Sequence, residues 1–303
     1  MNINRNIIFK NFSWLKDKDR FFITSSDYDG LICASFLSHY LGWKLVGYYN
    51  MENIWISKKG LEHKKELIWV DLNIVPQLGK SIGGQIANID NNLPSGLKSS
   101  CNLNIINNVT YKNFKNKFPF STLIFLLWLY NIDIKSKLVS KLFILHSDSS
   151  WVKIQRYNKN VNHWIELLED YNWNNLFSNI DTIDYEKSID QILYPYLINI
   201  GASTGFSKLK SKHLNIKTRE CRLNPDWDED IILNLFELFA QFLNWDCPEI
   251  PIIFSRINGK KDTIKLDLVF KEGLNNFILK NKVFSYAITS PFNLKYTIFN
   301  KLK

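Results

Sequence analysis

Asp27 and Asp29, near the N-terminus, have the spacing expected of carboxylates that bind a metal ion next to a phosphate. The apolar residues Phe21–Ile23 predict a buried strand, and two serines followed by Asp27 and Asp29 come directly after it. On a nearly extended turn, both carboxylates can face one hard cation. Beyond Leu31 the apolar residues recur with helical spacing, so free N–H groups at a helix start would be available to a phosphate. A metal ion and a phosphate in one place are what phosphoryl transfer requires.

The residues around this pair also fit a simpler structural role. Gly30 allows the chain to bend sharply between strand and helix, and Ser25, Ser26 and Gly30 are candidate substrate-binding residues at this turn. The alternative is that Asp27 and Asp29 only cap the helix and stay solvated. This stretch of sequence leaves both interpretations open.

The elements that would position such a site alternate between strands and helices. Strands are predicted at residues 44–49, 66–71, 85–90 and 141–148, and a buried helix at residues 121–130. The last three strands end in Asp71, Asp90 and Asp148. In an open α/β sheet, ligands bind at the carboxyl ends of the parallel strands. The sequence therefore predicts an α/β fold with an open, mainly parallel sheet flanked by helices and acids along one edge.

In the order and spacing of these acids, the chain resembles a known family, the DHH phosphoesterases. The first family motif resembles Ser26-Asp27-Tyr28-Asp29-Gly30 and the second Val70-Asp71, whereas the third, Asp-His-His, would fall at Asp90-Asn91-Asn92 and the fourth at Asp148. The resemblance covers roughly residues 20–150. The family includes single-strand exonucleases, oligoribonucleases, cyclic-dinucleotide phosphodiesterases and family II pyrophosphatases.

This resemblance implies a phosphodiester hydrolase that uses one or two divalent ions, Mn²⁺ or Mg²⁺. The implied metal ligands are Asp27, Asp29, Asp71, Asp90 and Asp148, and the implied catalytic residues are Asp71, Asp90, Asn91 and Asn92. The largest departure is Asn91-Asn92 in place of two histidines. An amide oxygen is a poorer manganese ligand than imidazole, although acceptable to magnesium. An amide also cannot donate a proton as a histidine does.

Functions of different classes therefore remain open. The first is a metal-dependent phosphodiesterase or nuclease that acts on nucleotides or single-stranded nucleic acid. The second is a pseudoenzyme that has lost turnover through Asn91 and Asn92 and serves as a nucleic-acid-binding or complex-assembly subunit with a protein partner. A third, an α/β nucleotide binder of another lineage, would apply if the aspartates did not converge. His39 and His146 are candidate replacement ligands, although His39 is expected in a surface or packing role.

The second half of the chain is predicted to form a smaller α+β domain, which divides the chain into residues 1–180 and 181–303. Alternating runs after Ile250, separated by Asn258-Gly259 and Glu272-Gly273, indicate hairpins. A basic stretch in this half would bind a phosphate backbone, the alternative being a solvated charged loop. Its candidate binding residues are Lys208, Lys210, Lys212, Arg219 and Arg222.

Composition narrows the class of protein further. A hydrophobic content of 46% excludes a disordered chain, and a net charge of +9 favours acidic partners, nucleic acid above all. The longest apolar stretch, Leu123–Tyr130, is too short to span a bilayer, and the N-terminus lacks the apolar core of a signal peptide. A soluble protein without a membrane partner is therefore expected. An intracellular location is expected because the four cysteines show neither zinc-finger spacing nor a disulfide pattern: Cys33, Cys101, Cys221 and Cys247.

Overall fold

The computed structural model describes residues 3–76, 79–89, 93–134, 137–168 and 170–299. The chain divides into two compact units, each assembled from separate segments. The first unit contains Met1–Lys10, Ser26–Leu41 and Pro119–Pro248, and the second contains Asn11–Ser25, Gly42–Phe118 and Glu249–Lys303. The predicted domain division between residues 180 and 181 stays a prediction. Within the described ranges, no helix has the length and apolar character needed to cross a membrane.

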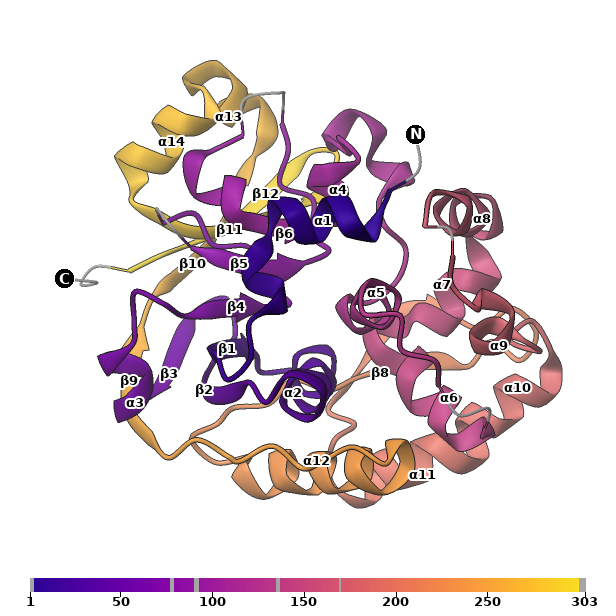
Figure 1. The fold of residues 1–303 in the computed structure, drawn as a ribbon. Coiled ribbons are helices and arrows are strands. Elements are labelled where there is room, and N and C mark those ends of the chain that lie inside the picture. Colours follow the sequence, from indigo (N-terminus) through magenta and orange to yellow (C-terminus); the bar gives the residue numbers. More distant parts are fainter. Residues whose placement is uncertain (1–2, 77–78, 90–92, 135–136, 169, 300–303) are drawn as a thin grey trace. The chain divides into compact units, whose positions relative to one another are not determined.

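The second unit is built on a seven-stranded, mainly parallel sheet, so the predicted α/β class is confirmed (Figure 1). In spatial order its strands are β6 (Ser100–Asn102), β5 (Lys80–Gly83), β4 (Ile68–Val70), β1 (Phe21–Ser25), β2 (Lys44–Tyr49), β3 (Asn53–Ser57) and β9 (Ile253–Asn258). The strands from β6 to β2 are parallel, and β3 is antiparallel to both β2 and β9. Since the central strands are buried on both faces, they read in the sequence as continuous apolar runs.

The C-terminal segment shares the hydrophobic core of this unit. Phe284 and Phe299 pack in one cluster with Ile23 of β1 and Trp69 of β4. A three-stranded antiparallel sheet has the order β10 (Lys260–Lys265), β12 (Asn293–Ile298) and β11 (Val283–Ser290). The helices of this unit are α3 (Lys58–Glu62), α4 (Leu103–Ile106), α13 (Leu266–Glu272) and α14 (Leu274–Asn281), with 3-10 turns at Ser13–Lys16, Ser95–Ser99 and Tyr111–Asn116.

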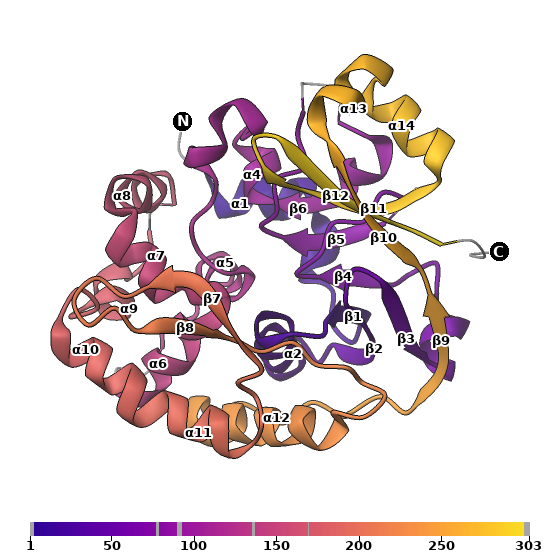
Figure 2. The same cartoon turned by 180° about the vertical axis from the view of Figure 1, so that it is seen from behind.

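The first unit is mainly helical and carries one antiparallel hairpin, β7 (Gly205–Lys210) and β8 (Lys217–Glu220) (Figure 2). Its helices are α1 (Arg5–Asn11), α2 (Tyr28–Leu41), α5 (Thr122–Leu129), α6 (Leu138–His146), α7 (Ser150–Arg156), α8 (Asn158–Leu167), α9 (Trp173–Phe177), α10 (Ile183–Ser188), α11 (Tyr194–Asn199) and α12 (Glu229–Leu243), with a 3-10 turn at Ser147–Ser149 and a π-helical turn at Ile189–Leu193. Helix α2 packs against α5 and α12. Because α5 is buried along its whole length, its sequence is apolar on every side.

Several predicted elements are confirmed. Strands β1, β2 and β4 lie where the apolar runs placed them, and α2 begins at the turn that carries Asp27. Helix α5 starts directly after Ser121, whose hydroxyl accepts a hydrogen bond from the backbone N–H of Ile124 at 3.2 Å. These elements combine a clear apolar pattern with a recognisable start, which is why the sequence locates them well.

The strand predicted at residues 85–90 is wrong. The strand that follows β4 in the chain is β5, which ends at Gly83, and the described residues 84–89 form only isolated bridges. Ile86 is buried because its backbone pairs with Ile288 of β11. The apolar pattern of this stretch therefore reflects packing against the C-terminal segment.

The strand predicted at residues 141–148 is also wrong, because this stretch forms helix α6 and the turn after it. All residues from Ser140 to His146 are buried, so the apolar run has no polar side to reveal its helical period. The predicted hairpins differ as well. Asn258-Gly259 joins β9 to β10, which belong to different sheets, and Glu272-Gly273 joins helices α13 and α14.

Candidate functional site

In the first unit, Asp27 caps the helix that follows it. Its Oδ1 accepts a hydrogen bond from the backbone N–H of Gly30 at 3.0 Å, the geometry of a helix N-cap. The backbone around Asp27 runs beside residues 221–223. The carbonyl of Ser26 accepts a hydrogen bond from the N–H of Leu223, and the backbones of Asp27 and Arg222 form an isolated antiparallel β-bridge. The turn of the first predicted motif and the end of the basic stretch are therefore neighbours within one unit.

Asp29 is a buried carboxylate in the first turn of α2. Its Oδ2 accepts a hydrogen bond from the backbone N–H of Thr122, the first residue of α5, at 3.4 Å. Two helix N-termini thus meet at this side chain, and the partial positive charge of each favours the anion. Asp29 has a structural role at these helix starts, whatever else it binds.

Asp148 does not follow a strand, in contrast to the prediction. It lies in the 3-10 turn after α6 with a left-handed φ of +46°, and its carboxylate forms an ion pair with Lys153. The neighbouring Ser147 donates a hydrogen bond to Ser121 Oγ at 2.6 Å. Since Ser121 caps α5, the turn that carries Asp148 is joined to the same helix start that Asp29 contacts.

In the second unit, Asp71 directly follows β4 at the carboxyl edge of the parallel sheet. Thr24 of β1 pairs with Val70 of β4, which brings Ser25 next to Asp71. The Ser25 hydroxyl donates to Asp71 Oδ2 at 2.9 Å, and Gln85 Nε2 donates to the Asp71 carbonyl at 2.9 Å. The left-handed φ of +62° at Asp71 turns the chain out of the strand at this point.

Amide side chains dominate the rest of this edge. Asn102, at the end of β6, donates to Asn73 Oδ1 at 3.0 Å and to the carbonyl of Gln85 at 2.8 Å. Among the residues that the structure describes, Gln85 Oε1 and Asn88 Oδ1 are buried atoms without a hydrogen-bond partner. These amides are not indicated by the sequence pattern, which predicts a strand across residues 85–90 and no strand at β6. The available signal was an amide at or shortly after the end of each of β4, β5 and β6.

The structure brings some of the predicted site residues together within each unit. Ser25 and Asp71 belong to the second unit; Ser26, Asp27, Asp29, Gly30, Asp148, Lys208, Lys210, Lys212, Arg219 and Arg222 belong to the first. Asp90, Asn91 and Asn92 lie outside the described residues. Among the residues that the structure describes, no group of three or more His, Cys, Asp or Glu side chains is arranged to hold a metal ion.

The two candidate histidines have packing and surface roles. His39 on α2 lies with Nδ1 2.9 Å from Asp246 Oδ2, which agrees with the surface role expected of it. His146 is buried, with its ring edge-on to those of Tyr28 and Tyr194 at centroid distances of 4.7 and 5.8 Å. Burial lowers the pKa of His146 to about 4, so its imidazole is neutral near pH 7.

The carboxylate, hydroxyl and amide groups described above offer oxygen atoms as ligands. Oxygen ligands suit a hard cation such as Mg²⁺ better than a metal ion that prefers imidazole ligands. In both units, carboxylate oxygens of this set already accept hydrogen bonds from the chain itself: Asp71 from Ser25, Asp27 from Gly30 and Asp29 from Thr122. No protein-family model, curated protein or solved structure matches this chain. The function of this chain is therefore inferred from its own residues.

Proposed function

We propose that this chain is a DHH-type, divalent-metal-dependent phosphodiesterase or nuclease that acts on nucleotides or single-stranded nucleic acid inside the cell. The observation that carries the proposal is the position of the carboxylates in the chain. Asp27 and Asp29 follow β1, and Asp71 follows β4, two neighbouring parallel strands. The carboxyl ends of such strands are where α/β sheets bind ligands. The intracellular location is supported by the four cysteines, none of which is in a disulfide.

Asp27, Asp29 and Asp71 are the proposed metal ligands, with Asp90 and Asp148 as further candidates. When bound, Mg²⁺ or Mn²⁺ would activate water and offset the negative charge of the phosphate. Ser25 contributes by positioning, because its hydrogen bond to Asp71 fixes the orientation of that side chain. With oxygen donors in the majority, the proposal favours Mg²⁺ over Mn²⁺.

A second candidate function is favoured by the amides of the sheet edge. Asn73, Gln85 and Asn102 stand at the ends of β4, β5 and β6, where a catalytic edge would carry charged ligands. Neutral amides form hydrogen bonds but contribute no charge to a metal site. The second candidate is accordingly a pseudoenzyme, a nucleic-acid-binding or assembly subunit that works with a protein partner.

Hydrolysis of a defined substrate panel separates the two candidates. The panel contains a short single-stranded DNA, an oligoribonucleotide, a cyclic dinucleotide and pyrophosphate, each tested with Mg²⁺, with Mn²⁺ and with EDTA. We expect metal-dependent cleavage of the single strand or of the cyclic dinucleotide, and none with EDTA. Intact substrates under every condition, together with retained binding of the single strand, would contradict the enzyme and support the pseudoenzyme.

A further inference from the structure

The β7–β8 hairpin of the first unit presents a basic face with one aromatic ring. Alternate residues of β7 are exposed, and these are Phe206, Lys208 and Lys210. On β8, Arg219 lies opposite Phe206, and Lys217 lies opposite Lys210. Residues directly opposite each other in an antiparallel pair point to the same side of the sheet. One face of the hairpin therefore carries an aromatic ring and four cationic side chains.

The ring of Phe206 is exposed and flanked by cations. Its side chain is 60% exposed, and the Arg219 guanidinium and the Lys217 ammonium lie 4.8 and 5.8 Å from the ring centroid. A nucleobase can stack on an aromatic ring, while nearby cations bind the phosphates on either side of that base. This combination of groups matches the alternating base and phosphate chemistry of a single strand.

Three cations of this face have no carboxylate partner among the described residues. Within the described part of the chain, Lys208, Lys210 and Lys217 form no ion pair. Their neighbours differ, since Lys212 pairs with Asp181 and Arg222 lies 3.1 Å from Glu220. An anionic partner would therefore find its counter-charges along the two strands, where they are available to phosphates.

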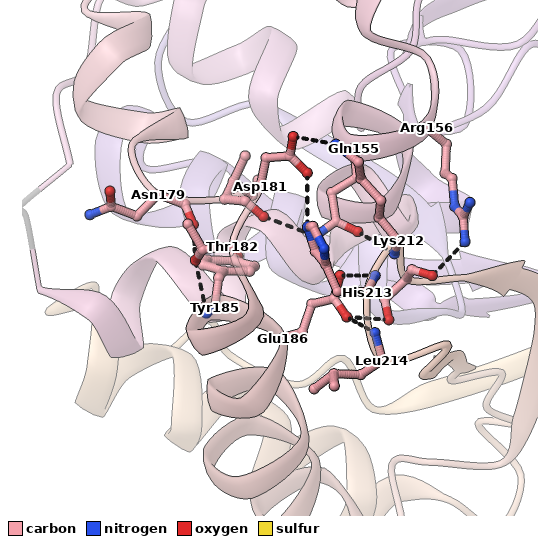
Figure 3. A network of polar contacts seen from close by, with 12 residues as sticks. Gln155, Arg156, Asn179, Asp181, Thr182, Tyr185, Glu186, Lys212, His213 and Leu214 are labelled. Carbon is pink, nitrogen blue, oxygen red and sulfur yellow. Dashed lines mark hydrogen bonds and ion pairs between the residues drawn. The ribbon is translucent and has the colours of Figure 1, made fainter.

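The hairpin is held in place before any ligand arrives. The buried carboxylate of Glu186 accepts hydrogen bonds from Ser211 Oγ at 2.6 Å and from the backbone N–H groups of His213 and Leu214 at 3.0 and 2.7 Å (Figure 3). Arg156 donates from Nε to the carbonyl of Lys210 at 3.0 Å. Because the connection between the strands is fixed in this way, binding would cost little additional ordering of the backbone.

The hairpin also leads directly to the turn that carries Asp27. The chain leaves β8 at Glu220, and residues 221–223 then run beside residues 26–28 of the same unit. A nucleic-acid strand bound along the hairpin would thus be close to Asp27, one of the proposed metal ligands.

We propose that the exposed β7–β8 face binds single-stranded nucleic acid, with Phe206 stacking on a base and Lys208, Lys210 and Lys217 binding phosphates. This inference rests on the proposed function and deepens it, because it names a polymeric single strand rather than a mononucleotide as the ligand. In a duplex the faces of the bases are already stacked, and an anionic lipid surface has no bases. The single strand is therefore the partner that uses both the ring and the cations.

Fluorescence anisotropy with a labelled 20-nucleotide DNA and its RNA counterpart, in EDTA, tests the proposal. Phe206→Ala is expected to weaken binding roughly 5- to 150-fold, the range for loss of one stacked base. The matched control is Phe254→Ala on β9, since Phe254 is similarly exposed at 68%, and its effect is expected to stay within about 2-fold. Replacing Lys208 and Lys210 with alanine is expected to reduce the slope of log affinity against log salt by about 1.4.

Equal affinities of the wild type, the Phe206→Ala variant and the double-lysine variant would overturn the proposal. Tighter binding of duplex DNA or of phosphatidylserine vesicles than of the single strands would overturn it as well, in favour of those partners. Circular dichroism of each variant checks that the fold is retained. Because EDTA removes metal, failure here concerns the hairpin alone, whereas retained binding without hydrolysis in metal would count against the proposed enzyme.

Discussion

Replacing Asp71 with asparagine is expected to reduce metal-dependent phosphodiester hydrolysis about 100-fold or more. The substitution keeps the shape of the side chain but replaces a charged oxygen with an amide group at the carboxyl end of β4. The hydroxyl of Ser25, which donates to Oδ2, would then face a neutral partner. The measurement is kcat/KM on the best substrate of the panel, with Mg²⁺ and with Mn²⁺.

The matched control for this prediction is Asp246→Asn. Asp246 is an exposed carboxylate paired with His39, and it has no role in the proposed site. Its kcat/KM is expected to equal that of the wild type within experimental error. An Asp71→Asn variant that is as active as this control would remove Asp71 from the set of metal ligands.

Glu186→Gln is expected to lower the free energy of unfolding of the first unit by about 2–4 kcal/mol. Glu186 is fully buried, and three donors from the connection between β7 and β8 converge on its carboxylate. A glutamine would direct an NH₂ group at some of these donors and leave them unsatisfied. Chemical denaturation measures the change, with the exposed Glu166→Gln on α8 as the control, for which less than about 0.5 kcal/mol is expected.

The stability that Glu186 contributes depends on pH in a defined direction. Burial alone would raise the pKa of this carboxyl, but the hydrogen bonds from Ser211, His213 and Leu214 outweigh it and lower the pKa below its ordinary value of 4.5. The charged form is therefore favoured in the folded state. Its contribution is complete above the ordinary pKa and disappears as the pH falls through the lowered value. Parallel stability curves of wild type and Glu186→Gln between pH 7 and pH 3 would contradict this assignment.

Local sequence pattern was sufficient for elements whose burial has a simple form. The strands β1 and β2 are short apolar runs between polar residues, and α5 has an apolar sequence with a serine cap. Helix α6 was missed because burial on all sides removes the difference between helical and strand periodicity. The misplacement of β5 followed from the burial of Ile86 by a partner about 200 residues away.

Long-range pairing accounts for the features of the candidate site that sequence analysis missed. The neighbourhood of Asp27 and Arg222 joins segments that are far apart in the chain, and no local pattern indicates it. The anchoring of the hairpin by Glu186 is similar, because a buried glutamate looks the same in the sequence as a solvated one. The basic stretch was recognised from its charge, whereas the position of Phe206 on the same face as the lysines required the register of β7 and β8.

The most direct test of the account is calorimetric titration of Mg²⁺ and Mn²⁺ into the wild type and the Asp71→Ala variant. We predict stoichiometric binding of one or two ions to the wild type and a loss of binding in the variant. The ratio of Mg²⁺ affinity to Mn²⁺ affinity is expected to be higher than at a site with imidazole ligands. Identical titrations of the two proteins, or no heat of binding at millimolar metal in the wild type, would contradict it.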